Sequence, residues 1–88
     1  MKRIAIPPGV TTIAENTFNS CYSARLFDFR RHVAVPTLQN TSAFANTPSN
    51  KKIVVPDNLY DTWIATNNWS SSTNNIKNSI IKASAYVE

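Results

Sequence analysis

The chain has 88 residues, of which 42 % are hydrophobic and only 16 % are charged, so it is long enough for one domain around one core. Its single Cys excludes a disulfide within the chain, and one His, one Cys and five acidic residues are too few to predict a metal site. Nine Lys and Arg residues give a net charge of +4, which raises the question of an anionic partner.

Three apolar segments, at residues 4–6, 26–29 and 53–55, are each bounded by turn-forming residues. Their β-branched and aromatic side chains predict three short β-strands. When the chain is aligned with itself, Ile6 corresponds to Phe29, and Phe29 corresponds to Val55. A further apolar piece at residues 33–35, just before a proline, predicts another strand within the second unit.

The offset that relates Phe29 to Val55 also aligns residues 17–20 with residues 43–46, so that Phe18 corresponds to Phe44. In the first unit Cys21 follows Phe18 at a spacing that fits one face of a short helical turn. A unit of roughly 23–26 residues is too short to bury its own apolar side, so it must stack on a neighbour that presents the same side. The sequence therefore predicts an α/β repeat fold, a short solenoid of strands joined by turns or short helical pieces.

The last third of the chain predicts a closing segment. Asp57 follows a proline and is a favourable N-cap residue. Apolar side chains spaced by four predict a helix of about ten residues after it. Residues 70–75 are polar and predict a loop. A final apolar group predicts a short helix or strand that packs back on the closing segment. Trp63 and Trp69 are expected to cover the open end of the repeat stack. The helix spacing rests on Leu59, Tyr60, Trp63 and Ile64, and the final group on Ile76, Ile80 and Ile81.

Residues 4–21 read Ile-Ala-Ile-Pro-Pro-Gly-Val-Thr-Thr-Ile-Ala-Glu-Asn-Thr-Phe-Asn-Ser-Cys, and this stretch resembles the repeat unit of the BspA-like, or Treponema-type, leucine-rich repeats. The shared features are a strand, a proline turn, a Val-Thr-x-Ile pattern, and a Phe followed one helical turn later by a Cys. Thr17 departs from the Ala that is usual in that family. Residues 26–29 and 43–48 resemble degenerate later units.

This resemblance implies a single domain over residues 1–88. Within it, degenerate repeats at residues 4–56 would form a leucine-rich-repeat solenoid, and residues 57–88 would form its C-terminal helical cap. The family implies binding or adhesion at a bacterial surface or on a phage particle, with no catalytic residue, no metal and no cofactor. The expected partner is a host glycan or a host protein.

Two other functions remain open. The chain can act purely as a structural cap or oligomerisation module that ends a longer solenoid, with repeats upstream or a second copy packed on its first unit. More weakly, it can be a basic nucleic-acid binder that uses Arg25, Arg30 and Arg31; no known nucleic-acid-binding motif supports that reading. Residues 1–8 do not resemble a signal peptide, so the expected extracellular or particle location is that of a larger protein. No apolar run approaches the roughly 20 residues needed to span a bilayer, so membrane insertion is not expected.

Candidate contact residues follow from these readings. Exposed aromatic and Arg side chains carry much of the energy of interfaces and stack well on sugars, although simple packing explains each aromatic more readily than ligand contact does. A Cys21–His32 nucleophilic pair is disfavoured, because in the repeat register Cys21 occupies a buried turn. The predicted ligand contacts are Tyr22, Arg25, Arg30, Arg31 and Tyr60, and the predicted self-association residues are Ile4, Ile6, Val10 and Ile13.

Overall fold

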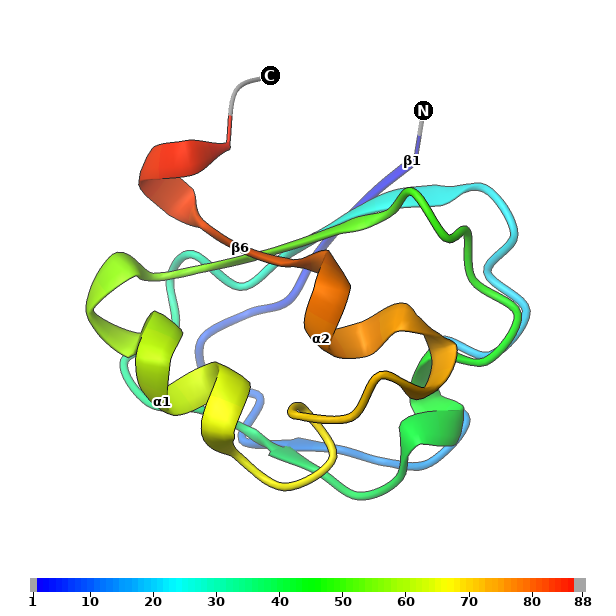
Figure 1. Ribbon diagram of the computed structural model, residues 1–88, viewed down its shortest axis with the longest axis horizontal. Coiled ribbons are helices and arrows are strands. Elements are labelled where there is room, and N and C mark those ends of the chain that lie inside the picture. The colour runs from blue at the N-terminus through cyan, green and yellow to red at the C-terminus, as the bar shows by residue number, and fades with distance from the viewer. Residues whose placement is uncertain (1, 87–88) are drawn as a thin grey trace.

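A computed structural model describes residues 2–86, and they form a small α/β fold built on a parallel sheet (Figure 1). Four strands lie side by side in chain order, with β1 at one edge and β6 at the other, and each neighbouring pair is parallel. A second sheet pairs two short strands in parallel, on the opposite side of the molecule in Figure 1. The main sheet contains β1 (Lys2–Ala5), β3 (Ala24–Asp28), β5 (Lys52–Val55) and β6 (Ile80–Lys82); the second contains β2 (Thr12–Ile13) and β4 (Thr37–Leu38).

The strands of the main sheet align their inward residues in one row. Ile4 pairs with Phe27, Phe27 with Ile53, and Ile53 with Ile80. Because side chains alternate between the two faces of a strand, this register places an apolar residue of every strand on the inner face. The strands predicted at residues 4–6, 26–29 and 53–55 are therefore present, each beginning slightly earlier in the chain than predicted.

The segments that follow β2 and β4 also lie side by side, as the repeat offset predicts. Phe18 N donates to Ala43 O at 2.8 Å, and Ser20 N donates to Ala45 O at 3.0 Å. The Phe18 ring packs on the Phe44 ring with centroids 5.3 Å apart, and both pack edge-on against Phe27, at 4.9 and 5.1 Å. Residues 17–20 form turns and not a helix, whereas Thr41–Phe44 form a 3₁₀ turn.

Two short helices connect β5 to β6. A 3₁₀ turn (Asp57–Leu59) leads into α1 (Tyr60–Ala65), and another (Thr73–Asn75) leads into α2 (Ile76–Ser79). Trp63 and Trp69 are both fully buried, and their rings meet edge-on at 5.3 Å. Trp69 Nε1 donates to Pro36 O at 2.8 Å, so the segment after α1 is fixed to the segment before β4.

Two local predictions are wrong. Asp57 does not cap the helix that it precedes, because its carboxylate Oδ1 accepts from Ser84 N at 3.0 Å and Pro56 occupies the N-cap position. Residues 33–35 form no strand, and Val33 is 87 % exposed. The chain turns at residues 29–32, where His32 N donates to Phe29 O at 3.0 Å, and the strand begins only at Thr37, after Pro36.

One apolar cluster extends from Ile6 to Ile80 and joins both sheets to α1 and α2. Its largest members are aromatic, and Phe29 contacts both Trp63 and Trp69 at 5.3 and 5.6 Å. None of the helices in the described part of the chain is both long enough and apolar enough to cross a membrane.

Candidate functional site

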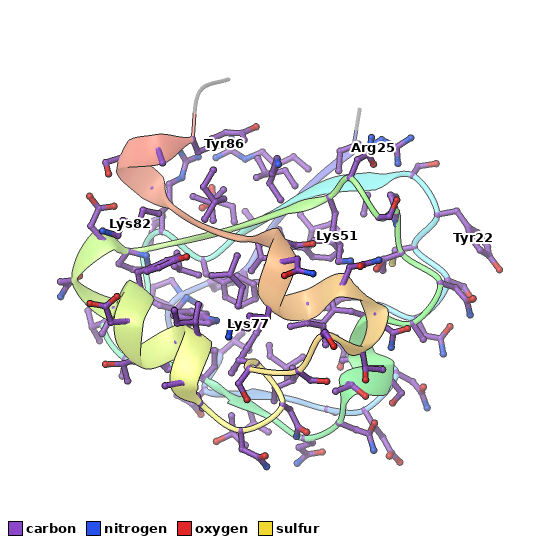
Figure 2. The ribbon with its side chains drawn as sticks, viewed as in Figure 1. Tyr22, Arg25, Lys51, Lys77, Lys82 and Tyr86 are labelled. Carbon is purple, nitrogen blue, oxygen red and sulfur yellow. The ribbon has the colours of Figure 1, made fainter. Side chains whose placement is uncertain are left out.

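An open depression of about 540 Å³ lies at the end of the main sheet where β3 and β5 begin. The turn before β3 forms one wall and residues 46–50 form the other. Figure 2 shows Tyr22 extending away from the body of the molecule on this side, whereas Arg25 lies nearer to the N-terminal end of β1. The lining residues are Tyr22, Arg25, Asn46, Thr47, Pro48, Ser49 and Asn50.

Tyr22 is the most exposed aromatic residue that borders the depression, with 69 % of its surface accessible. The preceding Ser20 has a left-handed backbone, with φ of 67°, and Tyr22 N donates back to Ser20 O at 2.9 Å. Arg25 is half-buried, and its Nη1 donates to Tyr22 O at 3.4 Å. The turn thus leaves the phenol ring exposed, and the guanidinium group of Arg25 contacts the backbone carbonyl of Tyr22.

The opposite wall is held by its own hydrogen bonds. Asn46, with φ of 59°, donates through Nδ2 to Asn19 Oδ1 at 3.2 Å, and Thr47 Oγ1 donates to Phe44 O at 2.6 Å. Ser49 and Asn50 are exposed, and no hydrogen bond occupies their side chains within the described part of the chain. The depression therefore offers one aromatic face together with free hydroxyl and amide groups on a constrained backbone.

Lys51 lies behind this wall, with only 1 % of its surface accessible. Its Nζ donates to Pro48 O at 3.3 Å and to Asn74 O at 2.8 Å. Figure 2 places Lys51 inside the fold, on the side of the sheet that faces α2. Burial lowers the pKa of Lys51 from its ordinary value, because an ammonium group is less well solvated inside the protein than in water.

The other predicted contact residues lie elsewhere. Arg30 binds Asp28 through Nε and Nη2, each at 3.0 Å, and its guanidinium carbon lies 5.9 Å from the centre of the Tyr86 ring. Arg31 is exposed. Tyr60 is half-buried on α1, with Lys82 Nζ 5.4 Å from its ring centre. Of the predicted ligand contacts, only Tyr22 and Arg25 come together.

Asp28 is the most strongly perturbed carboxylate in the described part of the chain. Burial raises its pKa, but hydrogen bonds from the side chain and backbone of Arg30 outweigh that effect. A further bond from Arg3 adds to them, and the pKa falls to about 2. Asp28 therefore stays ionised and neutralises part of the charge of Arg3 and Arg30, which weakens the case for a phosphate-binding surface here.

The predicted self-association residues are divided between interior and surface. Ile6 and Ile13 are buried in the core of the single chain. Ile4 and Val10 are only half-buried and pack against the edge of that core. Contact with a second copy would therefore be made by Ile4, Val10 and the backbone edge of β1.

The Cys21–His32 pair has no arrangement typical of a nucleophile and its base. Cys21 is half-buried against the core. His32 is buried, its Nε2 lies 2.9 Å from Val10 O, and its ring packs on Phe29 and Trp63. Among the residues that the structure describes, no three His, Cys, Asp or Glu side chains come close enough to hold a metal ion.

Sequence reasoning missed the wall at residues 46–50 and the buried Lys51. Both had a signal in the sequence. The repeat offset aligns Asn46 with Ser20, which is close to Tyr22. Lys51 is two residues before Ile53, and side chains two residues apart in an extended segment point to the same face, so Lys51 is expected on the inward side. Comparison with protein-family models, with curated proteins and with solved structures finds no match to this chain.

Proposed function

We propose that this chain is a capped pair of leucine-rich-repeat coils and that it serves as a binding module. Each of the first two coils would contain one strand of each sheet: β1 with β2, and β3 with β4. The parallel register and the hydrogen bonds between residues 18–20 and 43–45 support this reading. The cap would be formed by α1, which carries Trp63, by the turn after it, which carries Trp69, and by α2.

The partner that we propose is a glycan, bound in the depression beside Tyr22. The observation that carries this proposal is an exposed aromatic ring beside a polar, concave surface. Sugar rings stack their C–H faces on aromatic rings, and their hydroxyl groups require donors and acceptors at the rim. Asn46, Ser49 and Asn50 would supply those groups.

This function needs no catalytic residue and no cofactor. Binding without turnover fits the surroundings of Cys21 and His32, which are occupied by packing and a backbone contact. The proposed setting is the surface of a bacterium or of a phage particle, where the module would be part of a larger repeat protein that adheres to a host.

A glycan array tests this proposal with three versions of the whole chain. The wild type should bind a defined subset of glycans, Tyr22→Ala should lose that signal, and Tyr22→Phe should keep most of it, because the ring is retained. Circular dichroism of all three proteins checks that they fold. Binding that Tyr22→Ala leaves unchanged, or no binding to any glycan by the folded wild type, would contradict the proposal.

A second candidate function is oligomerisation, and the unpaired edge of β1 favours it. Within the described residues β1 pairs only with β3, so one side of its backbone has no strand partner. Open strand edges tend to recruit another strand. A second copy of this chain would cover that edge together with Ile4 and Val10.

A further inference from the structure

We infer that the depression beside Tyr22 prefers glycans that carry a carboxylate, such as sialic or hexuronic acids, over neutral ones. This inference rests on the proposed function and narrows it to a substrate class. It is drawn from two cations without an acidic partner in the described chain, Arg25 and Lys51, at and behind the same surface.

The first cation is exposed to a ligand. Arg25 lines the depression, and only one of its guanidinium nitrogens has a hydrogen-bond partner within the described residues, the carbonyl of Tyr22. The ion pairs of the described residues centre on Asp28 and involve Arg3 and Arg30, so no carboxylate of the described chain neutralises Arg25. A planar guanidinium group binds a carboxylate through two parallel hydrogen bonds.

The second cation acts from behind the wall. Lys51 donates to the carbonyl of Pro48, a residue that lines the depression, and it too has no acidic partner in the described part of the chain. Burial lowers the pKa of Lys51. In its protonated form Lys51 would be screened less by solvent than an exposed group, and would add to the attraction of an anion in the depression.

The lining itself contains no opposing charge. None of the lining residues in the described part of the chain is Asp or Glu. Because Tyr22 and Arg25 line the same depression, a carboxylate on a sugar that stacks on Tyr22 would meet the guanidinium group of Arg25 there. The exposed hydroxyl of Ser49 and amide of Asn50 would remain available for the neutral hydroxyls of the same sugar.

Affinities of matched probes test the inference. The probes are the methyl glycosides of sialic acid and of glucuronic acid, each compared with its uncharged carboxamide, titrated into the whole chain by calorimetry in low and high salt. We expect each acid to bind about fivefold to tenfold more tightly than its carboxamide in low salt, with a smaller ratio in high salt. The acid with the larger ratio of affinity over its carboxamide identifies which of the two sugar acids the depression prefers.

Two variants with the same loss of charge separate the site from net charge. Arg25→Gln should remove the preference for the acid over its carboxamide, whereas Arg31→Gln, at an exposed position outside the lining, should keep that preference. Equal loss in both variants, or equal affinity of the wild type for acid and carboxamide, would overturn the inference. If acid and carboxamide bind equally and both lose affinity in Tyr22→Ala, the glycan-binding proposal survives without the preference for carboxylates. If neither probe binds, the glycan-binding proposal and the preference both fail.

Discussion

At the residue scale, asparagine residues occupy the left-handed backbone positions that glycine usually occupies in small folds. The only glycine, Gly9, has no left-handed backbone, whereas five Asn residues and Ser20 do. Asn enters this region more easily than other residues with a side chain, because its short amide can bond to nearby groups. The sequence alone does not predict at which of these positions the backbone is left-handed, since that depends on where the neighbouring segment lies.

Asp28 should make stability depend on acid. Its folded pKa is about 2, below the ordinary value of 3.8, so on acidification the unfolded chain takes up a proton before the folded chain does. The stabilisation is complete above about pH 4 and should be lost as the pH falls through about 2. After allowance for screening at the exposed Arg3, we expect a loss of about 1 kcal/mol.

Urea unfolding at several pH values, followed by tryptophan fluorescence, measures this loss. Asp28→Asn should be less stable at pH 7 and should show a flatter decline between pH 4 and pH 2 than the wild type. Asp61→Asn, which removes an exposed carboxylate of α1, is the matched control and should keep the decline. The same slope in the wild type and in Asp28→Asn would show that the two Arg contacts do not lower this pKa.

The three main strands could be predicted, at the scale of elements, because apolar and β-branched side chains recur where the sheet must be buried. The strand expected at residues 33–35 has the same composition, but His32 fills the inward position instead, beside Val10 O. Val33 and Ala34 are therefore exposed, and Val35 packs only against the edge of the core. Leu38 becomes the buried residue of that segment. Composition alone does not distinguish the two cases, because the outcome depends on a contact between residues far apart in the sequence.

The predicted N-cap role of Asp57 is wrong for a related reason, because Asp57 contacts a distant part of the chain. Asp57 is a good cap in isolation, but its carboxylate finds a better-placed donor in Ser84 N, far along the chain. That bond lowers the pKa of Asp57 and ties the last 3₁₀ turn (Ala83–Ala85) to the start of α1. Local capping rules do not include such a partner.

The two tryptophans provide a matched test of how the closing segment is held. Both are fully buried, but Trp69 Nε1 donates to Pro36 O, whereas Trp63 Nε1 has no hydrogen-bond partner among the described residues. Substitution by Phe removes similar volume from each site. Trp69→Phe should therefore lower the free energy of unfolding by about 1 kcal/mol more than Trp63→Phe, because it also leaves a buried carbonyl without its donor.

Urea unfolding followed by far-ultraviolet circular dichroism measures both variants without relying on the fluorescence that they alter. Equal losses, or a larger loss in Trp63→Phe, would contradict the role given to the contact between Trp69 and Pro36. Such a result would leave the packing of the aromatic rings as the dominant contribution of both residues.

At the scale of the whole molecule, only one wall of the candidate site could be predicted directly from the sequence. Tyr22 and Arg25 are close in sequence, so their position on one side of the depression could be predicted. The opposite wall comes from residues 46–50, and its position depends on the bond between Asn46 and Asn19, which the repeat offset implies only indirectly. The sequence predicts that Arg30 and Arg31 contact the same ligand as Arg25, but Arg30 donates a hydrogen bond to Asp28 instead.

The open edge of β1 carries a prediction at this scale. We expect the purified chain to form a concentration-dependent dimer in light scattering, insensitive to salt because the contact is made by backbone groups with Ile4 and Val10. Val10→Lys should shift it toward the monomer, and Val33→Lys, an exposed position outside the core cluster, should not. A wild type that stays monomeric at every concentration would rule out this interface.

The most direct test of glycan binding beside Tyr22 is nuclear magnetic resonance of the whole ¹⁵N-labelled chain during titration with a glycan taken from the array. Backbone amide shifts should change at Tyr22, Arg25 and residues 46–50, while those of β1 and α1 stay in place. Shifts centred on the edge of β1, or spread evenly over the exposed Arg and Lys residues, would contradict the assignment of this depression as the binding site.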